Sequence, residues 1–194
     1  MTVLIATDVF GITPAVHSLA RSLGRKCRLV SPFSDIASAF YSEQKAYQAF
    51  LAEGGVARYA EKIQHLLKEQ GSHIHFAIGF SAGASALWLG STSPVFRHLQ
   101  MMSLFYGSRI RDYTDIQPVC PSRLIFAEKE AAFEPGLLAA ELKDKGHTVE
   151  LVKNTAHGFM NPYSGGFCVK SQARYLAELS QMLDTEEASH GELA

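Results

Sequence analysis

The most informative segment of the chain reads Gly79-Phe80-Ser81-Ala82-Gly83, between an apolar run at residues 73–78 and a helix-like run at residues 84–90. A serine with a glycine two residues away on either side is typical of a strained turn from a strand into a helix. The glycines let the backbones approach closely because they carry no Cβ atom. We therefore expect the Ser81 hydroxyl to stand clear of the sheet as a nucleophile; the alternative is that Ser81 only caps the next helix.

Short apolar or β-branched runs alternate with amphipathic segments along the whole chain. This alternation predicts a three-layer α/β sandwich, in which a mostly parallel sheet of about six strands carries helices on both faces. We expect strands at residues 3–7, 26–30, 73–78, 99–106, 122–127 and 148–152, and helices from Pro14 to Gly24 and at about 56–67, 84–90, 135–145 and 169–183. The length of 194 residues predicts one domain over residues 1–184 and a flexible acidic tail over residues 185–194.

Composition restricts the possible partners and the compartment. The net charge is −1 and the basic residues are scattered, so we expect no binding to nucleic acid or to an anionic membrane. No stretch reaches the ~20 apolar residues of a membrane span, and the apolar run at residues 3–6 is too short for a signal peptide. Three widely spaced cysteines favour neither a disulfide framework nor a CxxC site. These features predict a cytoplasmic protein.

A serine nucleophile needs a histidine to take its proton and a carboxylate to hold that histidine. His157 belongs to the segment Thr155-Ala156-His157-Gly158-Phe159, which comes after the last predicted strand, on a loop that would lie at the carboxyl edge of the sheet, where ligand and catalytic groups gather. We expect His157 to be this base, the alternative being an exposed loop histidine.

Two carboxylates follow the predicted strand at residues 122–127 and are candidates to orient His157. Glu130 is preferred to Glu128, since it lies further from the strand end, in a loop long enough to turn back toward the histidine. Either of them could instead be a solvated loop charge.

The segment Asp8-Val9-Phe10-Gly11 ends the first predicted strand at the same edge. We expect the backbone N–H groups of Val9 and Ala82 to form an oxyanion hole, and Phe10 to line the pocket. Asp8 has two open interpretations: it hydrogen-bonds Ser81 in the resting state, or it caps the loop.

Other polar groups near this edge have less specific patterns. Arg109 or Arg111 could bind a substrate carboxylate or could be surface residues paired with neighbouring aspartates. His73 and His75 share a face of a strand but have no third ligand, so we expect no metal site.

Four landmarks together resemble the dienelactone hydrolase family of the α/β-hydrolase superfamily. They are Asp8-Val9-Phe10-Gly11, Gly79-Phe80-Ser81-Ala82-Gly83, Phe105-Tyr106-Gly107 and His157-Gly158-Phe159. The resemblance spans residues 4–183 and implies a compact α/β-hydrolase core that begins late, with no room before Val3 for the two opening strands of that family. It also adds Tyr106 and Phe159 as pocket candidates.

This chain departs from the founding enzymes of that family at four places. They carry a cysteine at the position of Ser81, a glutamate at that of Asp8 and an aspartate at that of Glu130. They also have an arginine shortly after the His-Gly-Phe motif, where this chain has Met160-Asn161-Pro162. The serine makes the chain more similar to the serine esterases of the family.

These observations predict a serine hydrolase that cleaves a small carboxylic ester, lactone or thioester without a metal or organic cofactor. Ser81 would be the nucleophile, His157 the base and Glu130 the acid of the triad. The expected partner is a small-molecule ester or lactone substrate. Two alternatives remain open: a catalytically degenerate binding or regulatory module with the same fold, and acyl transfer to an acceptor other than water.

Overall fold

A single parallel sheet forms the centre of the molecule. The computed structural model describes residues 2–34, 42–70 and 73–191. Within them, the strands lie in the order β2-β1-β3-β4-β5-β6, and every neighbouring pair is parallel. Their bounds are β1 (Thr2–Ala6), β2 (Lys26–Val30), β3 (Ile74–Phe80), β4 (Met101–Phe105), β5 (Ser122–Lys129) and β6 (Thr148–Ala156).

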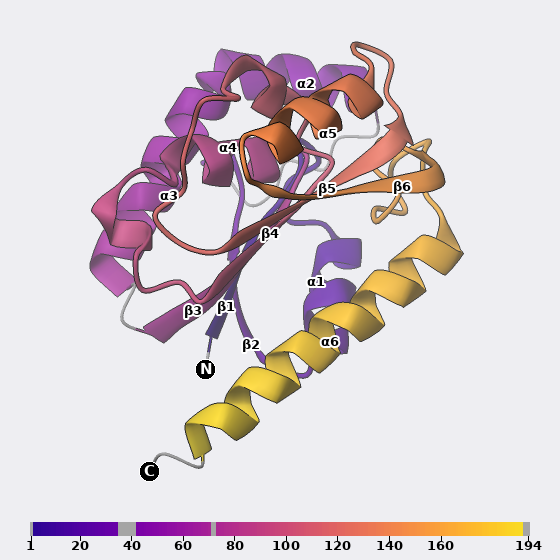
Figure 1. Cartoon of the computed structure of the whole chain (residues 1–194). Coiled ribbons are helices and arrows are strands. Elements are labelled where there is room, and N and C mark those ends of the chain that lie inside the picture. Colours follow the sequence, from indigo (N-terminus) through magenta and orange to yellow (C-terminus); the bar gives the residue numbers. More distant parts are fainter. Residues whose placement is uncertain (1, 35–41, 71–72, 192–194) are drawn as a thin grey trace.

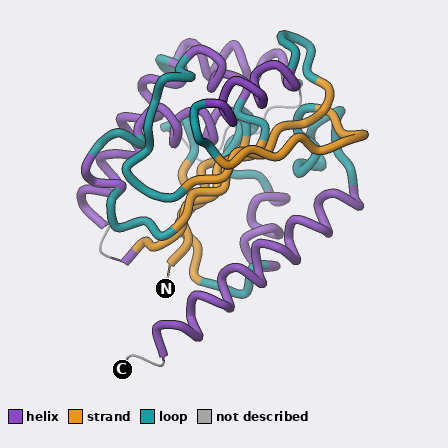
Figure 2. Tube along the Cα trace, viewed as in Figure 1, coloured by secondary structure: helices purple, strands orange, loops and turns teal. Residues whose placement is uncertain are grey.

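Helices cover both faces of this sheet, as Figures 1 and 2 show. One face carries α1 (Pro14–Ser22) and α6 (Val169–Gly191), and the other carries α3 (Gly55–Gln70), α4 (Ala82–Gly90) and α5 (Pro135–Asp144), with α2 (Glu43–Ala52) against α3. Two short 3-10 helices, η2 (Pro94–Phe96) and η3 (Ser108–Asp112), flank β4. Each face has its own apolar core; the fully buried Trp88 belongs to one and the fully buried Phe105 to the other. The expected three-layer α/β architecture is confirmed.

Several boundaries differ from the sequence-based expectation. Helix α6 runs to Gly191 instead of ending near Leu183, while residues 192–194 of the predicted tail lie outside the described residues. Strands β5 and β6 extend together, because Lys129 pairs with Ala156 beyond the apolar part of each strand. Helix α2 was not predicted at all. None of the described helices is both long and apolar enough to span a bilayer.

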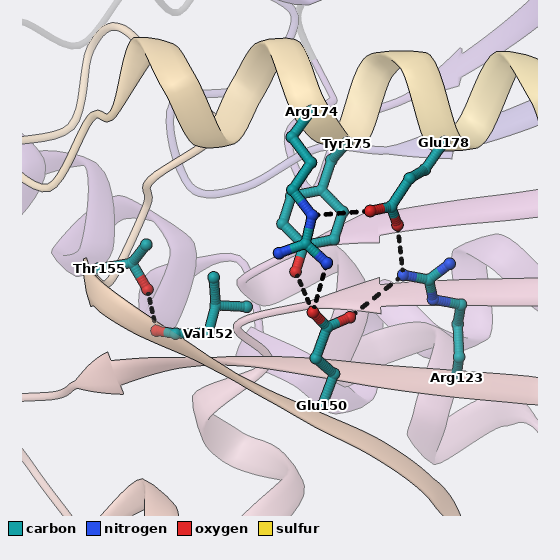
Figure 3. A network of polar contacts seen from close by, with 7 residues as sticks. All are labelled: Arg123, Glu150, Val152, Thr155, Arg174, Tyr175 and Glu178. Atoms are coloured by element: carbon teal, nitrogen blue, oxygen red, sulfur yellow. Dashed lines mark hydrogen bonds and ion pairs between the residues drawn. The ribbon is translucent and has the colours of Figure 1, made fainter.

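A network of charged side chains fastens α6 to β5 and β6 (Figure 3). Glu150 of β6 accepts a hydrogen bond from the Tyr175 hydroxyl at 2.8 Å and pairs with Arg174 at 2.8 Å and with Arg123 at 3.4 Å. Glu178 of α6 pairs with the same two arginines, at 2.7 and 3.1 Å. Each carboxylate thus bridges two cations, which stabilises more than isolated exposed pairs do. Since α6 follows the loop after β6, the network also anchors one end of that loop.

The turn between β3 and α4 is the tightest connection in the fold. Ser81 has a left-handed φ of 50°, which an L-residue adopts at a cost. A Cβ atom added to Gly79 would lie 2.6 Å from Ala84 Cα, and one added to Gly83 would lie 2.2 Å from the Ala6 carbonyl oxygen. Helix α4 can therefore lie directly on β1 and β3 only because both positions are glycine.

Replacing Gly83 by alanine tests this close approach. We expect Gly83→Ala to prevent folding or to lower the free energy of unfolding by about 3 kcal/mol or more, because the clash is with backbone and no side chain can move away. Urea unfolding followed by circular dichroism measures the change. The matched control is Gly136→Ala in α5, where an added Cβ meets nothing within 4 Å. This control should keep or slightly raise stability, and a Gly83→Ala protein as stable as the control would contradict the analysis.

Candidate active site

Three side chains from different strand ends form one hydrogen-bonded array at the carboxyl edge of the sheet. Ser81 Oγ lies 2.8 Å from His157 Nε2, and His157 Nδ1 lies 2.8 Å from Glu130 Oε1. Ser81 follows β3, Glu130 follows β5 and His157 follows β6. The structure thus brings together the three residues that the sequence analysis grouped as nucleophile, acid and base.

Strand pairing explains why Glu130 and His157 meet. Lys129 and Ala156 are partners at the ends of β5 and β6, and the His157 N–H donates to the Lys129 carbonyl at 3.2 Å. Glu130 and His157 are the first residues after the ends of the two paired strands, so their side chains are neighbours. The expectation that Glu130 turns back from within a loop is therefore wrong, because β5 is longer than predicted.

The competing carboxylate, Glu128, lies within β5 and has another partner. Its Oε2 atom accepts a hydrogen bond from the Asn154 N–H at 2.8 Å. Asn154 has a φ of 58°, next to the irregularity in the pairing of β5 with β6. Glu128 therefore accepts a hydrogen bond from a backbone N–H of β6 at the place where the strand pairing is irregular. Glu130 is the carboxylate that contacts His157.

The surroundings of His157 raise its pKa above the usual histidine value. Burial lowers this pKa, but the hydrogen bond and the negative charge of Glu130 raise it, as do the charges of Glu43 and Asp8, and their sum outweighs burial. The Glu130 side chain is only 5% exposed, which leaves its charge little screened by solvent. The array therefore favours a proton on His157 once it has accepted one.

From the sequence, we expect two backbone N–H groups at this edge, those of Val9 and Ala82, to form an oxyanion hole. Ala82 is the first residue of α4, so its N–H has no partner within the helix, and Val9 lines the same cleft as Ser81. Neither N–H donates a hydrogen bond within the described part of the chain. The Ser81 side chain makes no capping hydrogen bond to α4, which argues against a purely capping role.

Asp8 is buried beneath the cleft and caps its own loop. Its Oδ1 atom accepts the Phe10 N–H at 3.0 Å, and its Oδ2 atom accepts the Asn161 side-chain amide at 2.5 Å. Among the described residues no hydrogen bond joins Asp8 to Ser81. Phe10 is not in the cleft wall either: it is 4% exposed, with its ring 6.1 Å from that of Tyr163.

The two aromatic pocket candidates lie behind the histidine and do not line the cleft. Tyr106 and Phe159 are fully buried, and their ring centroids are 5.0 Å apart. The Tyr106 ring also meets the His157 ring edge-on at 5.2 Å. The Tyr106 ring therefore supports the position of the imidazole from the core side and packs on Phe159; neither ring lines the cleft at Ser81, but Tyr106 borders a small hollow beside Asp8 and Asn161.

An open cleft of about 390 Å³ lies over the array. One wall carries Arg109 and Arg111 from η3, both of which are paired with Asp112. Another wall comes from α2, which contributes Glu43, Gln44 and Tyr47. Sequence reasoning missed this wall, although Ser42 as N-cap and the four-residue spacing of Ala46 and Phe50 are signals of a short helix.

The cleft continues past His157 into a second hollow of about 500 Å³. Its walls include Lys129 and the loop segment Ser164-Gly165-Gly166, and it shares Glu130 and His157 with the first. In the described residues, no group of three or more His, Cys, Asp or Glu side chains could hold a metal ion.

One curated protein is a clear relative of this chain in sequence. "Uncharacterized protein YczH" of Bacillus subtilis (strain 168) is 31% identical over 172 residues, which cover 84% of this chain and 82% of YczH. No protein-family model matches the chain.

Solved structures show where the fold belongs. The dienelactone hydrolase-like promiscuous phosphotriesterase P91 from metagenomic libraries superposes with a TM-score of 0.66 at 20% identity, over 95% of this chain and 85% of that one. XC6422 of Xanthomonas campestris, an α/β serine hydrolase without a lid, superposes with a TM-score of 0.60 at 15% identity, over 94% of this chain and 82% of that one. A cold-adapted esterase from an Arctic intertidal metagenomic library superposes with a TM-score of 0.57 at 16% identity, over 93% of this chain and 81% of that one.

The sequence match and the fold lead to the same assignment. The superposed proteins share the parallel-sheet fold of this chain, which confirms the expected resemblance at the level of the fold. The chain belongs to the same family as YczH of Bacillus subtilis, and its fold is that of the dienelactone hydrolase-like α/β hydrolases.

Proposed function

We propose that the protein is a serine hydrolase that cleaves a small carboxylic ester, lactone or thioester through an acyl-enzyme on Ser81. The observation that carries this proposal is the unbroken chain of hydrogen bonds from Ser81 through His157 to Glu130. A serine hydroxyl is a weak nucleophile until an adjacent base takes its proton, and this arrangement supplies the base and the group that orients it.

The proposed reaction runs in two half-reactions on the same residues. His157 Nε2 takes the proton of Ser81 as Oγ bonds to the carbonyl carbon, and the N–H groups of Val9 and Ala82 hydrogen-bond the oxyanion that forms. The tetrahedral intermediate collapses, and His157 gives its proton to the leaving oxygen or sulfur atom. A water molecule, deprotonated by His157, then attacks the acyl-enzyme; the acid product leaves and the proton returns to Ser81.

The alternative of a degenerate binding module is less well supported by the site. A module without chemistry has no need for a serine at a strained φ of 50° or for a buried carboxylate aimed at a histidine. Acyl transfer uses the same residues, so product analysis in the presence of alcohol or amine acceptors separates it from hydrolysis. The neighbouring structures named as hydrolases and esterases are consistent with either.

We further propose that the substrate carries an anionic group at the arginine side of the cleft. Arg109 uses its Nε atom on Asp112 at 2.9 Å, and no hydrogen bond from its terminal nitrogens is found among the described residues, so they can bind a ligand. Arg111 donates to the Ser108 carbonyl at 2.5 Å and lies over the Phe133 ring at 5.1 Å, so it is held in place. One aspartate balances two guanidinium groups, and a net positive charge remains on this wall.

Removing members of the array tests the proposed function. Ser81→Ala and His157→Ala should each lower kcat for an activated ester by about four orders of magnitude or more, and the double variant should be little worse, because the residues act as one unit. Steady-state hydrolysis of para-nitrophenyl acetate measures this. Losses that add up in the double variant, or turnover that survives Ser81→Ala, would contradict the proposal.

Glu130 and Glu128 provide a matched pair of variants that tests which carboxylate is the acid of the triad. Glu130→Gln should lower kcat by about a hundredfold or more, and it should move the acid limb of the kcat/KM profile to lower pH. Only neutral His157 can act as the base, so wild-type activity rises as the pH passes the pKa of His157. Because Glu130 raises this pKa above the usual histidine value, removing its charge should lower the pH at which activity rises. Glu128→Gln is the control and should leave both quantities unchanged. An unshifted profile in Glu130→Gln would exclude Glu130 as the orienting acid.

Substrate charge can be tested with two esters of nearly the same shape. Mono-para-nitrophenyl glutarate should be cleaved with a kcat/KM about tenfold higher than a neutral ester in which an isopropyl group replaces the carboxylate, since a hydrogen bond to a charged group is worth about that factor. Arg109→Gln and Arg111→Gln should reduce this preference. Arg97→Gln, on an exposed arginine before the opposite end of β4, should not. Equal rates for the two esters would refute the anionic substrate.

A further inference from the structure

Two loops from opposite ends of the chain meet beneath the cleft through a buried pair of side chains. Asp8 lies in the loop after β1 and is 6% exposed, while Asn161 lies in the loop after β6 and is 7% exposed. The Asn161 amide donates a hydrogen bond of 2.5 Å to Asp8 Oδ2. The reaction proposed above assigns no step to either side chain.

Each member of the pair also fixes the backbone of its own loop. The second Asp8 oxygen accepts the Phe10 N–H, which turns the chain directly after Val9. Asn161 Oδ1 accepts the Tyr163 N–H at 2.9 Å, and the Asn161 N–H donates to the Gly158 carbonyl at 2.8 Å, one residue after His157. A single contact between side chains therefore joins the loop that carries one oxyanion donor to the loop that carries the base.

Burial disfavours the ionised form of the Asp8 carboxyl group. Burial raises its pKa to about 6, although both of its hydrogen bonds and the nearby His157 lower it, and Glu43 raises it further. Tyr59 and Tyr106 are the other titratable groups that sense its charge. With a pKa of about 6, Asp8 is mostly ionised at neutral pH, and its negative charge is one of the causes that raise the pKa of His157.

We propose that Asp8 and Asn161 form a clamp that holds the Val9 N–H at a fixed position relative to His157 and Ser81. The clamp is a positioning device for the hydrolase reaction proposed above and rests on that proposal. The oxyanion donor and the base must act on the same tetrahedral intermediate, so a shift of about 1 Å between their loops lowers kcat by up to a hundredfold.

The hydrogen-bonding pattern of the pair permits a rescue experiment. Asp8→Asn supplies one acceptor oxygen where the Asn161 amide and the Phe10 N–H need two, and Asn161→Asp puts two carboxylates in contact, so each single variant loses a hydrogen bond of the clamp or its charge balance. In the exchanged double variant, Asp8→Asn with Asn161→Asp, the amide again donates to the carboxylate, and the Phe10 and Tyr163 N–H groups again have oxygen acceptors.

We expect each single variant to lower kcat for para-nitrophenyl acetate about tenfold or more with little change in KM, and the double variant to recover most of the loss. Asp8→Asn should also move the acid limb of the kcat/KM profile to lower pH, because it removes a charge that raises the pKa of His157. Ser91→Ala is the control: it removes a buried hydrogen bond at the far end of α4, and should change stability without changing kcat or the pH profile.

Labelling by a neutral fluorophosphonate separates failure of the clamp from failure of the function. A wild-type protein that neither labels nor hydrolyses esters would overturn the proposed function and the clamp with it. If the wild type is active, single variants with wild-type kcat, or a folded double variant that recovers nothing, would overturn the clamp alone. If the double variant does not fold, Asn161→Ala is the deciding variant, because it removes the hydrogen bond to Asp8. It should lower kcat, and an unchanged kcat would refute the clamp.

Discussion

The close approach of α4 to β1 is the constraint on which the rest of the site depends. Gly83 lies so near the Ala6 carbonyl oxygen that no side chain fits between them, and the chain can reach this position from β3 only through the left-handed turn at Ser81. The same contact places the start of α4 beside the end of β1. The N–H groups of Ala82 and Val9, which we propose as the oxyanion donors, belong to these two adjoining segments, so the proposed oxyanion hole depends on backbone placement.

The parallel order of the strands supplies the remaining groups. Every strand presents its carboxyl end at the same edge, so Ser81, Glu130 and His157 meet there although they follow three different strands. Glu130 and His157 depend further on the long pairing of β5 with β6. The ion-pair network on α6 and the Asp8–Asn161 contact then fasten the loop after β6 from both sides. Position is thus determined by strand register first and by polar contacts between side chains second.

Local patterns revealed much of this architecture and missed what depends on tertiary contacts. The glycines around Ser81 and the place of His157 after an apolar strand were readable, because chain order and the φ preference of glycine are local properties. The extension of β5 to Lys129 was not, since its polar end is a strand only through pairing with β6. Likewise, nothing near Asp8 in the sequence indicates Asn161, 153 residues away. The α2 wall was missed because its few apolar positions give a weak helical pattern.

The most direct test of the central claim is the site of covalent modification by a neutral fluorophosphonate, mapped by peptide mass spectrometry. The account predicts one adduct per chain, on Ser81, formed faster as the pH rises through the pKa of His157 and absent in Ser81→Ala with the fold retained. An adduct on a different residue, or none in a folded protein that binds small esters, would contradict it and would favour a binding module on the same fold.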